Sequence, residues 1–263
     1  MTRVMGIVNV TPDSFSDGGR WLDPARAIAH ARRLVVEGAD IVDIGGESTR
    51  PGAVAVDEAT ELARTIPVIE ALAGTIGEVE ISIDTTKPAV ARAAVAAGAT
   101  IINDVSASLE AVAAETGAGW IAMHALGPSA TMQDDPVYDD VVVDIHAVLA
   151  AAVARGRAAG VARIWVDPGI GFGKTSAHNL DLVANLDHFS DLAPVVIGVS
   201  RKRFIGEIHA GSDGMAHESG ATPVDDRLEG SVALAAWSAY LGADIVRVHD
   251  VRATVHAVRV VQS

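Results

Sequence analysis

The chain has 263 residues, of which 49% are hydrophobic but only 4% aromatic, and its formal net charge is -14 at pH 7. This length, with a core of Ala, Val, Ile and Leu, fits one α/β barrel domain over residues 1–263 better than two small domains. The negative charge disfavours a general nucleic-acid or membrane-surface role. With no Cys, no signal peptide and no apolar stretch long enough to cross a bilayer, we expect a cytoplasmic enzyme.

Eight apolar, β-branched runs are predicted as buried parallel strands, each followed by a helical pattern. The runs are residues 4–8, 40–44, 79–83, 99–102, 120–123, 163–166, 194–199 and 244–248. A helix-stop and strand-start pattern with Gly-Ala recurs at residues 37–42, 97–102 and 241–246. Eight such units predict a single (β/α)₈ TIM barrel with long loops after its first two strands. The alternative, an open doubly wound sheet, usually shows a Gly-x-Gly-x-x-Gly turn after strand one, which is absent.

The helical stretches carry their own start and stop signals. The first begins at Pro24 and ends before Gly38. The stretch 57–73 contains Pro67, which predicts a kink or two short helices. The polar, glycine-rich segment 206–223 is predicted to be a mobile excursion between helical pieces.

Polar and charged residues stand at the end of every predicted strand, where a barrel gathers its active-site groups. Four of them can hold a flat heterocycle, because carboxylates accept N–H donors, an amide matches a mixed edge and an ammonium donates to ring oxygen and nitrogen. These four are Asp84, Asn103, Asp167 and Lys202. Each has a simpler reading as well: Asp84 as a helix cap, Asn103 with Asp104 as a turn, and Lys202 as part of a solvated basic cluster.

The segment after Asp167 contains three glycines in residues 167–175 (DPGIGFGKT). It reads either as a flexible turn or as a close backbone approach to a flat ligand, with Asp167 holding the ligand's edge and Phe172 covering the mouth.

An anion site is predicted at strand eight, where Arg247 and His249 point the same way just before a helix begins. This pair fits a diphosphate; the alternative is an ion pair between Arg247 and a neighbouring Asp. Asn9, at the end of strand one, could hold a Mg²⁺ ion that bridges the phosphates.

These blocks together resemble the dihydropteroate synthases. Residues 5–19 (MGIVNVTPDSFSDGG) are similar to the first signature of that family, and residues 45–52 (GGESTRPG) to the second. Supporting blocks follow in family order across the chain at residues 82–85, 102–106, 123–124, 167–175, 200–202 and 247–250.

The resemblance implies an enzyme of folate synthesis that joins (7,8-dihydropterin-6-yl)methyl diphosphate to p-aminobenzoate, giving 7,8-dihydropteroate and diphosphate, and that sulfonamides inhibit. It implies that the four strand-end residues above hold the pterin, and that Asn9, Arg247 and His249 hold the diphosphate with Mg²⁺. Further substrate contacts that it implies are Phe15, Thr49, Arg50, Pro51, Phe172 and Val248. It also favours a homodimer formed through late helices.

Some positions depart from the family pattern. Ala107 and Ser108 stand where glycine is usual, and Ala125 to Pro128 replace a Gln-Gly stretch. Arg203 replaces a serine beside the expected carboxylate site of p-aminobenzoate, where it could pair with that carboxylate or narrow the slot.

Two other functions remain open. A corrinoid-linked methyltetrahydrofolate methyltransferase would share the pterin-binding strand ends, but would not need the two long loops or the diphosphate pair. A catalytically silent pterin-binding paralogue would keep the binding residues.

Overall fold

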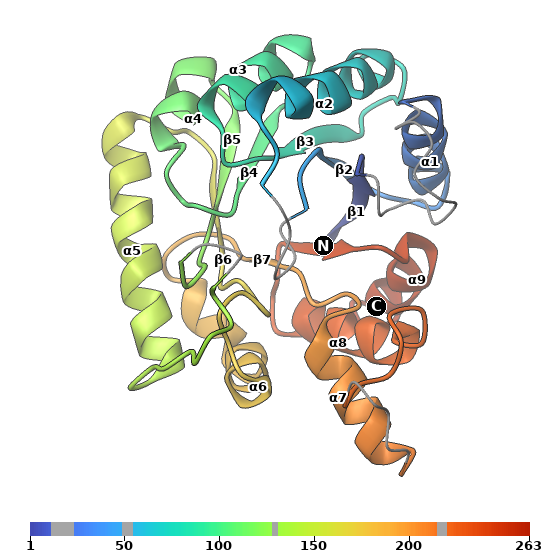
Figure 1. The fold of residues 1–263 in the computed structure, drawn as a ribbon, viewed down its shortest axis with the longest axis vertical. Helices are drawn as coiled ribbons and strands as arrows, with labels where there is room; N and C mark the ends of the chain where they lie inside the picture. The colour runs from blue at the N-terminus through green and yellow to red at the C-terminus, as the bar shows by residue number, and fades with distance from the viewer. Residues whose placement is uncertain (12–23, 49–54, 128–130, 215–219) are drawn as a thin grey trace.

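The computed structural model describes residues 1–11, 24–48, 55–127, 131–214 and 220–263. Its parallel strands lie in the order β6-β5-β4-β3-β2-β1-β8-β7 and curve into a barrel with the helices on the outside (Figure 1). The strands are β1 (Arg3–Asn9), β2 (Ile41–Gly45), β3 (Glu80–Asp84), β4 (Ile101–Asp104), β5 (Gly119–Met123), β6 (Ile164–Asp167), β7 (Val196–Ile197) and β8 (Ile245–Val248). The predicted (β/α)₈ barrel is confirmed.

The helices follow the strands around the ring. They are α1 (Pro24–Val36), α2 (Glu58–Leu72), α3 (Pro88–Ala97), α4 (Glu110–Thr116), α5 (Val141–Ala159), α6 (Ser176–Ala184), the 3₁₀ turn η2 (Leu186–Phe189), α7 (Arg203–Ser212), α8 (Leu228–Tyr240) and α9 (Val251–Val261). Among the described residues, none of these helices is both long and apolar enough to cross a membrane.

Two expectations about helices are corrected by the structure. Residues around Pro67 do not form two short helices: α2 is continuous through Pro67, because Val68, Ile69 and Leu72 are fully buried and their packing holds the helix together despite the lost hydrogen bond. The excursion expected at residues 206–223 is wrong for residues 206–212, which belong to α7, where Phe204, Ile205 and Ala210 are buried; residues 215–219 of that segment lie outside the described residues.

Side chains alternate between the two faces of each strand, and this alternation places the functional residues. One cluster of buried apolar side chains fills the barrel interior: Met5, Ile41, Ile101, Ile121, Trp165, Val196 and Ile245. Two residues further along four of these strands come Asp43, Asn103, Asp167 and Arg247, which therefore lie on the same inner face, one layer nearer the carboxyl ends.

The same alternation corrects one predicted contact. Val248 belongs to the larger core between the strands and the helices and is 1% exposed, so its side chain points away from the inner layer. Only the backbone of Val248 is left to meet a substrate.

The ring has one weak join, between β6 and β7. A six-residue strand was expected at residues 194–199, but β7 has only two residues. The segment that contains β7 is connected to β6 by a single β-bridge, between Val195 and Val166. Val195 and Val199 are buried nonetheless. Hydrophobicity marked these residues as buried, which is not the same as being hydrogen-bonded in a ladder.

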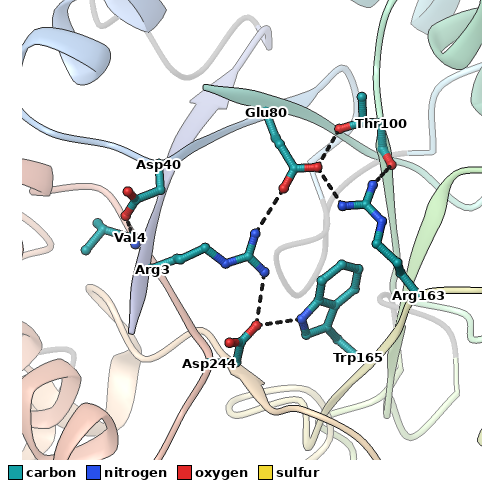
Figure 2. Close-up of polar contacts among 8 residues, drawn as sticks. All are labelled: Arg3, Val4, Asp40, Glu80, Thr100, Arg163, Trp165 and Asp244. Atoms are coloured by element: carbon teal, nitrogen blue, oxygen red, sulfur yellow. Dashed lines mark hydrogen bonds and ion pairs between the residues drawn. The ribbon is translucent and has the colours of Figure 1, made fainter. Parts of the chain in front are cut away.

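The amino ends of the strands are closed by a polar network, shown in Figure 2 and called the floor below; it consists of Arg3, Glu80, Thr100, Arg163, Trp165 and Asp244. Arg3 donates to Glu80 at 2.9 Å and to Asp244 at 3.0 Å. Arg163 donates to Glu80 at 2.8 Å, and the indole of Trp165 donates to Asp244 at 2.7 Å. The floor thus links β1, β3 and β6 with the residue that precedes β8.

Candidate active site

A cavity of about 680 Å³ opens at the carboxyl ends of the strands. Its lining includes Asn9, Asp84, Phe172, Lys202, Arg247 and His249. A smaller hollow shares four of these residues and adds Asn103 and Asp167. The structure therefore brings together the strand-end residues that were predicted to bind the ring and the diphosphate, as expected when parallel strands end on one rim.

Four predicted contacts cannot be placed. Phe15, Thr49, Arg50 and Pro51 lie outside the described residues.

Arg247 is held by two carboxylates inside the pocket. Its Nε donates to Asp43 Oδ2 at 2.6 Å and its Nη2 to Asp84 Oδ2 at 2.7 Å. Burial alone would lower the pKa of Arg247, but the two carboxylates overcome that effect and raise it, so the guanidinium stays charged. The ion pair that the sequence left open as an alternative is present, and it lies within the site.

Asp84 is poised to accept another hydrogen bond. Its Oδ1 is buried and has no partner in the described part of the chain. Burial raises the pKa of Asp84 to about 7, with Arg247 opposing the shift and Asp43 adding to it. Asp84 does not cap α3, whose N-cap residue Lys87 has no side-chain cap bond, and the simpler reading of Asp84 is thereby wrong.

Asp43 was missed by the sequence analysis, although it touches two predicted residues. It is 0% exposed, and its Oδ2 accepts from Asn103 Nδ2 at 3.0 Å as well as from Arg247. The available signal was a single carboxylate in an otherwise apolar strand, two residues after the interior Ile41.

Of the two residues that end β4, Asp104 forms the turn that was the simpler prediction for the pair, and Asn103 does not. Asp104 accepts from the backbone N–H groups of Ser106, Ser108 and Leu109, which is the bonding of a turn and a helix start. Asn103 faces the opposite way and lines the hollow.

The glycine-rich segment is built for close contact. Asp167 Oδ1 accepts from the N–H of Gly169 at 2.7 Å, and burial raises the pKa of Asp167 against this bond. Gly169 has φ +70°, and a Cβ there would lie 1.8 Å from the carbonyl oxygen of His124, so no other residue fits. The ammonium of Lys202 lies 4.3 Å from the ring centre of Phe172. These contacts favour the ligand-binding reading over a flexible turn.

Lys174 is a second residue that the sequence analysis did not single out. Its Nζ lies 3.0 Å from His124 Nδ1 and donates to the carbonyl of Phe172 at 2.9 Å. Burial lowers the pKa of Lys174 to about 7, and burial together with Lys174 lowers that of His124 to about 3. The buried lysine thus anchors the segment that carries Asp167 and Phe172.

The cationic side of the pocket lies at the ends of β7 and β8. His249 Nδ1 is 3.0 Å from Ser200 Oγ, and the His249 N–H donates to the same oxygen at 3.2 Å. Arg201 pairs with Asp250, the residue before α9, through bonds of 3.0 and 2.7 Å. Hydrogen-bond acceptors therefore line one part of the cavity, and cations with the start of a helix line another.

Comparisons with known proteins agree with this arrangement. Residues 5–249 match the family described as pterin binding enzyme. The dihydropteroate synthase of Mycobacterium leprae is 45% identical over 98% of this chain and 92% of the relative, and that of Escherichia coli is 46% identical over 99% and 91%.

Solved structures are similar over the same length. The Yersinia pestis dihydropteroate synthase with a sulfonamide drug has a TM-score of 0.90 at 43% identity and covers 99% of this chain and 93% of that one. The Xanthomonas albilineans dihydropteroate synthase in complex with 7,8-dihydropteroate has a TM-score of 0.84 at 43% identity, with coverage of 99% and 92%. This chain belongs to the pterin binding enzyme family and, within it, to the dihydropteroate synthases.

Proposed function

We propose that this chain joins (7,8-dihydropterin-6-yl)methyl diphosphate to p-aminobenzoate, releasing 7,8-dihydropteroate and diphosphate in folate biosynthesis, and that sulfonamides compete for its p-aminobenzoate slot. One observation carries the proposal: the acceptors Asp84, Asn103 and Asp167 share a pocket with the cations Lys202 and Arg247. A ligand bound there meets donors and acceptors along one edge and positive charge at the other.

The pterin half of the substrate fits the acceptors. The Oδ1 of Asp84, which has no partner among the described residues, and the carboxylate of Asp167 can accept N–H groups of the ring, and Lys202 can donate to ring oxygen and nitrogen. Phe172, held against Lys202, covers the ring.

The diphosphate fits the cations at the end of β8. Arg247 uses Nε and Nη2 for its two carboxylates, so Nη1 is the nitrogen that would donate to a phosphate, with His249 and the start of α9 beside it.

Mg²⁺ would be held by Asn9. The described residues contain no group of three or more His, Cys, Asp or Glu that could bind a metal. Mg²⁺ normally keeps several waters and takes oxygens from substrate phosphates, so one amide oxygen in the cavity wall, that of Asn9, fits this ion. When bound, the ion would neutralise part of the diphosphate charge.

The chemistry follows from these charges. The bond between the methylene carbon and the diphosphate oxygen breaks, and the diphosphate leaves with the electron pair. Arg247 and His249 stabilise the negative charge of the leaving diphosphate. The electron-rich dihydropterin carries the positive charge that develops, facing Asp84. The aniline nitrogen of p-aminobenzoate then bonds to the methylene carbon and loses a proton to solvent, so no strong base is required.

The p-aminobenzoate slot lies at the outer part of the cavity. Arg201, Lys202 and Arg203 line the wall there and offer positive charge to the carboxylate. The family resemblance implies that Phe15 and Pro51 flank the ring, beside Thr49.

The test is a diphosphate-release assay with the purified chain. We expect release only when both substrates and Mg²⁺ are present, and competitive inhibition by a sulfonamide against p-aminobenzoate. Pterin binding without release would indicate the silent paralogue instead. Methyl transfer from methyltetrahydrofolate to a corrinoid would indicate the methyltransferase.

We also propose that the chain forms a homodimer through its late helices. Trp237 and Tyr240 on α8 stack at 5.7 Å and are 50% and 67% exposed, and Val260 on α9 is 76% exposed. Exposed apolar groups of this size favour a protein interface. Light scattering would give twice the mass of the chain, and Trp237→Glu would shift it toward the monomer.

A further inference from the structure

Asp43 is a buried carboxylate whose two partners both line the pocket. One oxygen, Oδ2, accepts from Arg247 Nε at 2.6 Å and from Asn103 Nδ2 at 3.0 Å. The other oxygen, Oδ1, is buried and has no partner in the described part of the chain. Both Arg247 and Asn103 line the hollow that holds Asp84 and Asp167.

The chemistry of a carboxylate dictates how each partner is turned. An ionised carboxylate can only accept, so Asn103 must present its NH₂ group to Asp43 and cannot present its carbonyl oxygen. The carbonyl oxygen of Asn103 is thereby kept away from Asp43 and available to a ligand donor. The bond to Nε fixes the guanidinium of Arg247 at its root, and the bond from Nη2 to Asp84 fixes its plane.

Stability does not explain a carboxylate at this position. A buried ion pair gains little over well-packed apolar residues, and an unpartnered buried oxygen carries a desolvation cost. The neighbouring positions on the inner face of the ring, such as Ile41 and Ile101, are apolar and well packed. A charge that costs stability here needs a role in the site.

We propose that Asp43 is a positioning residue that acts on both parts of the substrate: it sets the direction of the Asn103 amide for the pterin and the direction of Arg247 for the departing diphosphate. The inference rests on the proposed function and concerns a residue that has no part in the binding and chemistry set out there. Asp43 is thereby bonded to a residue on the ring-binding side, Asn103, and to one on the anion-binding side, Arg247.

The experiment compares Asp43→Asn with a matched control, Asp104→Asn. Both replace a fully buried carboxylate with its isosteric amide, but Asp104 bonds to the turn after β4 and to the indole of Trp120 at 3.1 Å. For Asp43→Asn we expect pterin affinity, measured by fluorescence titration, to fall about tenfold or more, because the Asn103 amide is free to flip. Turnover should fall as well, while the KM for p-aminobenzoate at saturating pterin stays unchanged.

The control should behave in the opposite way. Asp104→Asn should lower the melting temperature and leave pterin affinity within about twofold of the unmodified chain, since its contacts lie on the other face of the strand. A purely structural role for Asp43 would make the two variants alike.

A double variant, Asp43→Asn with Asn103→Asp, sharpens the result. The swapped pair can still form its mutual hydrogen bond, so the double variant should fold with a melting temperature close to that of the unmodified chain. The pterin affinity should not return, because a carboxylate then replaces the amide facing the ring.

Several outcomes would overturn the inference. One is unchanged pterin affinity in Asp43→Asn, and another is full recovery of affinity in the double variant. The third is failure of both Asp43→Asn and the double variant to fold, which would make Asp43 a folding residue only. If the unmodified chain binds pterin but releases no diphosphate, the proposed function fails, and the pterin titrations still decide the role of Asp43.

Discussion

The two ends of the barrel use charge in opposite ways. On the floor, each charged group is paired with a group of opposite charge. Arg3 lies between Glu80 and Asp244, and Arg163 is the second arginine that pairs with Glu80 (Figure 2). Partial burial would raise the pKa of Glu80, but the hydrogen bonds from Arg163 and Thr100 and the positive charges of Arg163 and Arg3 overcome it and hold the pKa below its ordinary value.

At the carboxyl ends of the strands, charge is left incompletely matched. Two carboxylates share Arg247, each keeps one unpartnered oxygen among the described residues, and burial raises the pKa of Asp84 and Asp167. The comparison teaches that a barrel can use the same residue types for stability at one end and for ligand binding at the other. The difference lies in whether the bonds are completed within the protein.

The largest expected effect comes from Asp84→Asn at the pocket end. Turnover should fall by about 100-fold, because the developing positive charge on the pterin loses its facing carboxylate. The melting temperature should fall only modestly, since Arg247 loses the charge of Asp84 but keeps its ion pair with Asp43. Rates of diphosphate release and thermal melts measure the two quantities, and wild-type turnover with normal pterin binding would refute the electrostatic role of Asp84.

The pH dependence of pterin binding should come next in size. Burial raises the pKa of Asp84 from 3.8 to about 7, so the folded protein holds a proton that the unfolded chain has lost. The stability contributed by this proton is full below pH 3.8 and is lost as the pH rises through 7. Donor N–H groups prefer the ionised carboxylate, so pterin affinity should rise about tenfold between about pH 6 and pH 8.

Titrations of pterin at several pH values test this prediction. Asp84→Asn is the control, because it should give a nearly flat profile. An unmodified chain whose affinity is equally flat across the range would show that Asp84 is already ionised at pH 6.

A smaller effect on stability, with none on catalysis, is expected on the floor. Glu80→Gln weakens the bonds to Arg3 and Arg163, which are partly exposed, for a loss of about 1 kcal/mol. That loss lowers the melting temperature by about 2–4 °C. Circular dichroism melts check the shift, and unchanged kcat/KM would separate the floor from the pocket; a fall in kcat/KM would mean that the two ends are coupled.

The smallest effect is expected at the rim. Arg203 is 72% exposed in its side chain and pairs with Glu207 at 2.9 Å. Arg203→Ser should change sulfonamide inhibition by a few-fold, about the effect of one exposed charge, and leave pterin affinity unaltered. Sulfonamide inhibition curves and pterin titrations on the variant check this prediction. A changed pterin affinity with unchanged sulfonamide inhibition would contradict the placement of Arg203 beside the p-aminobenzoate slot.

Much of the barrel was predictable because its signals are local. Runs such as 40–44 and 99–102 are apolar and β-branched, and the strands form within one or two residues of them. The strand-end polar residues could be assigned to one rim because the topology of a parallel barrel leaves no other place.

The remaining features depend on contacts between distant parts of the chain. Asp43 meets Arg247 across 204 positions of sequence, and no local pattern announces that bond. The side chain of Val248 points outward because side chains alternate along β8, and the alternation that placed Arg247 on the inner face predicts this. The family resemblance covers residues 247–250 as a block and does not distinguish inward from outward side chains. The short β7 reflects hydrogen bonding, which hydrophobicity does not report.

The weak join between β6 and β7 has a consequence for how the protein responds to its substrate. Every other neighbouring pair of strands shares a ladder, whereas these two share the bridge between Val166 and Val195. Asp167 is the last residue of β6, and Lys202 lies five residues after the end of β7. A pterin ring bound by both, as proposed above, would connect the two strands. Amide protons near the bridge should then exchange fastest in the free protein and slow the most when pterin is added.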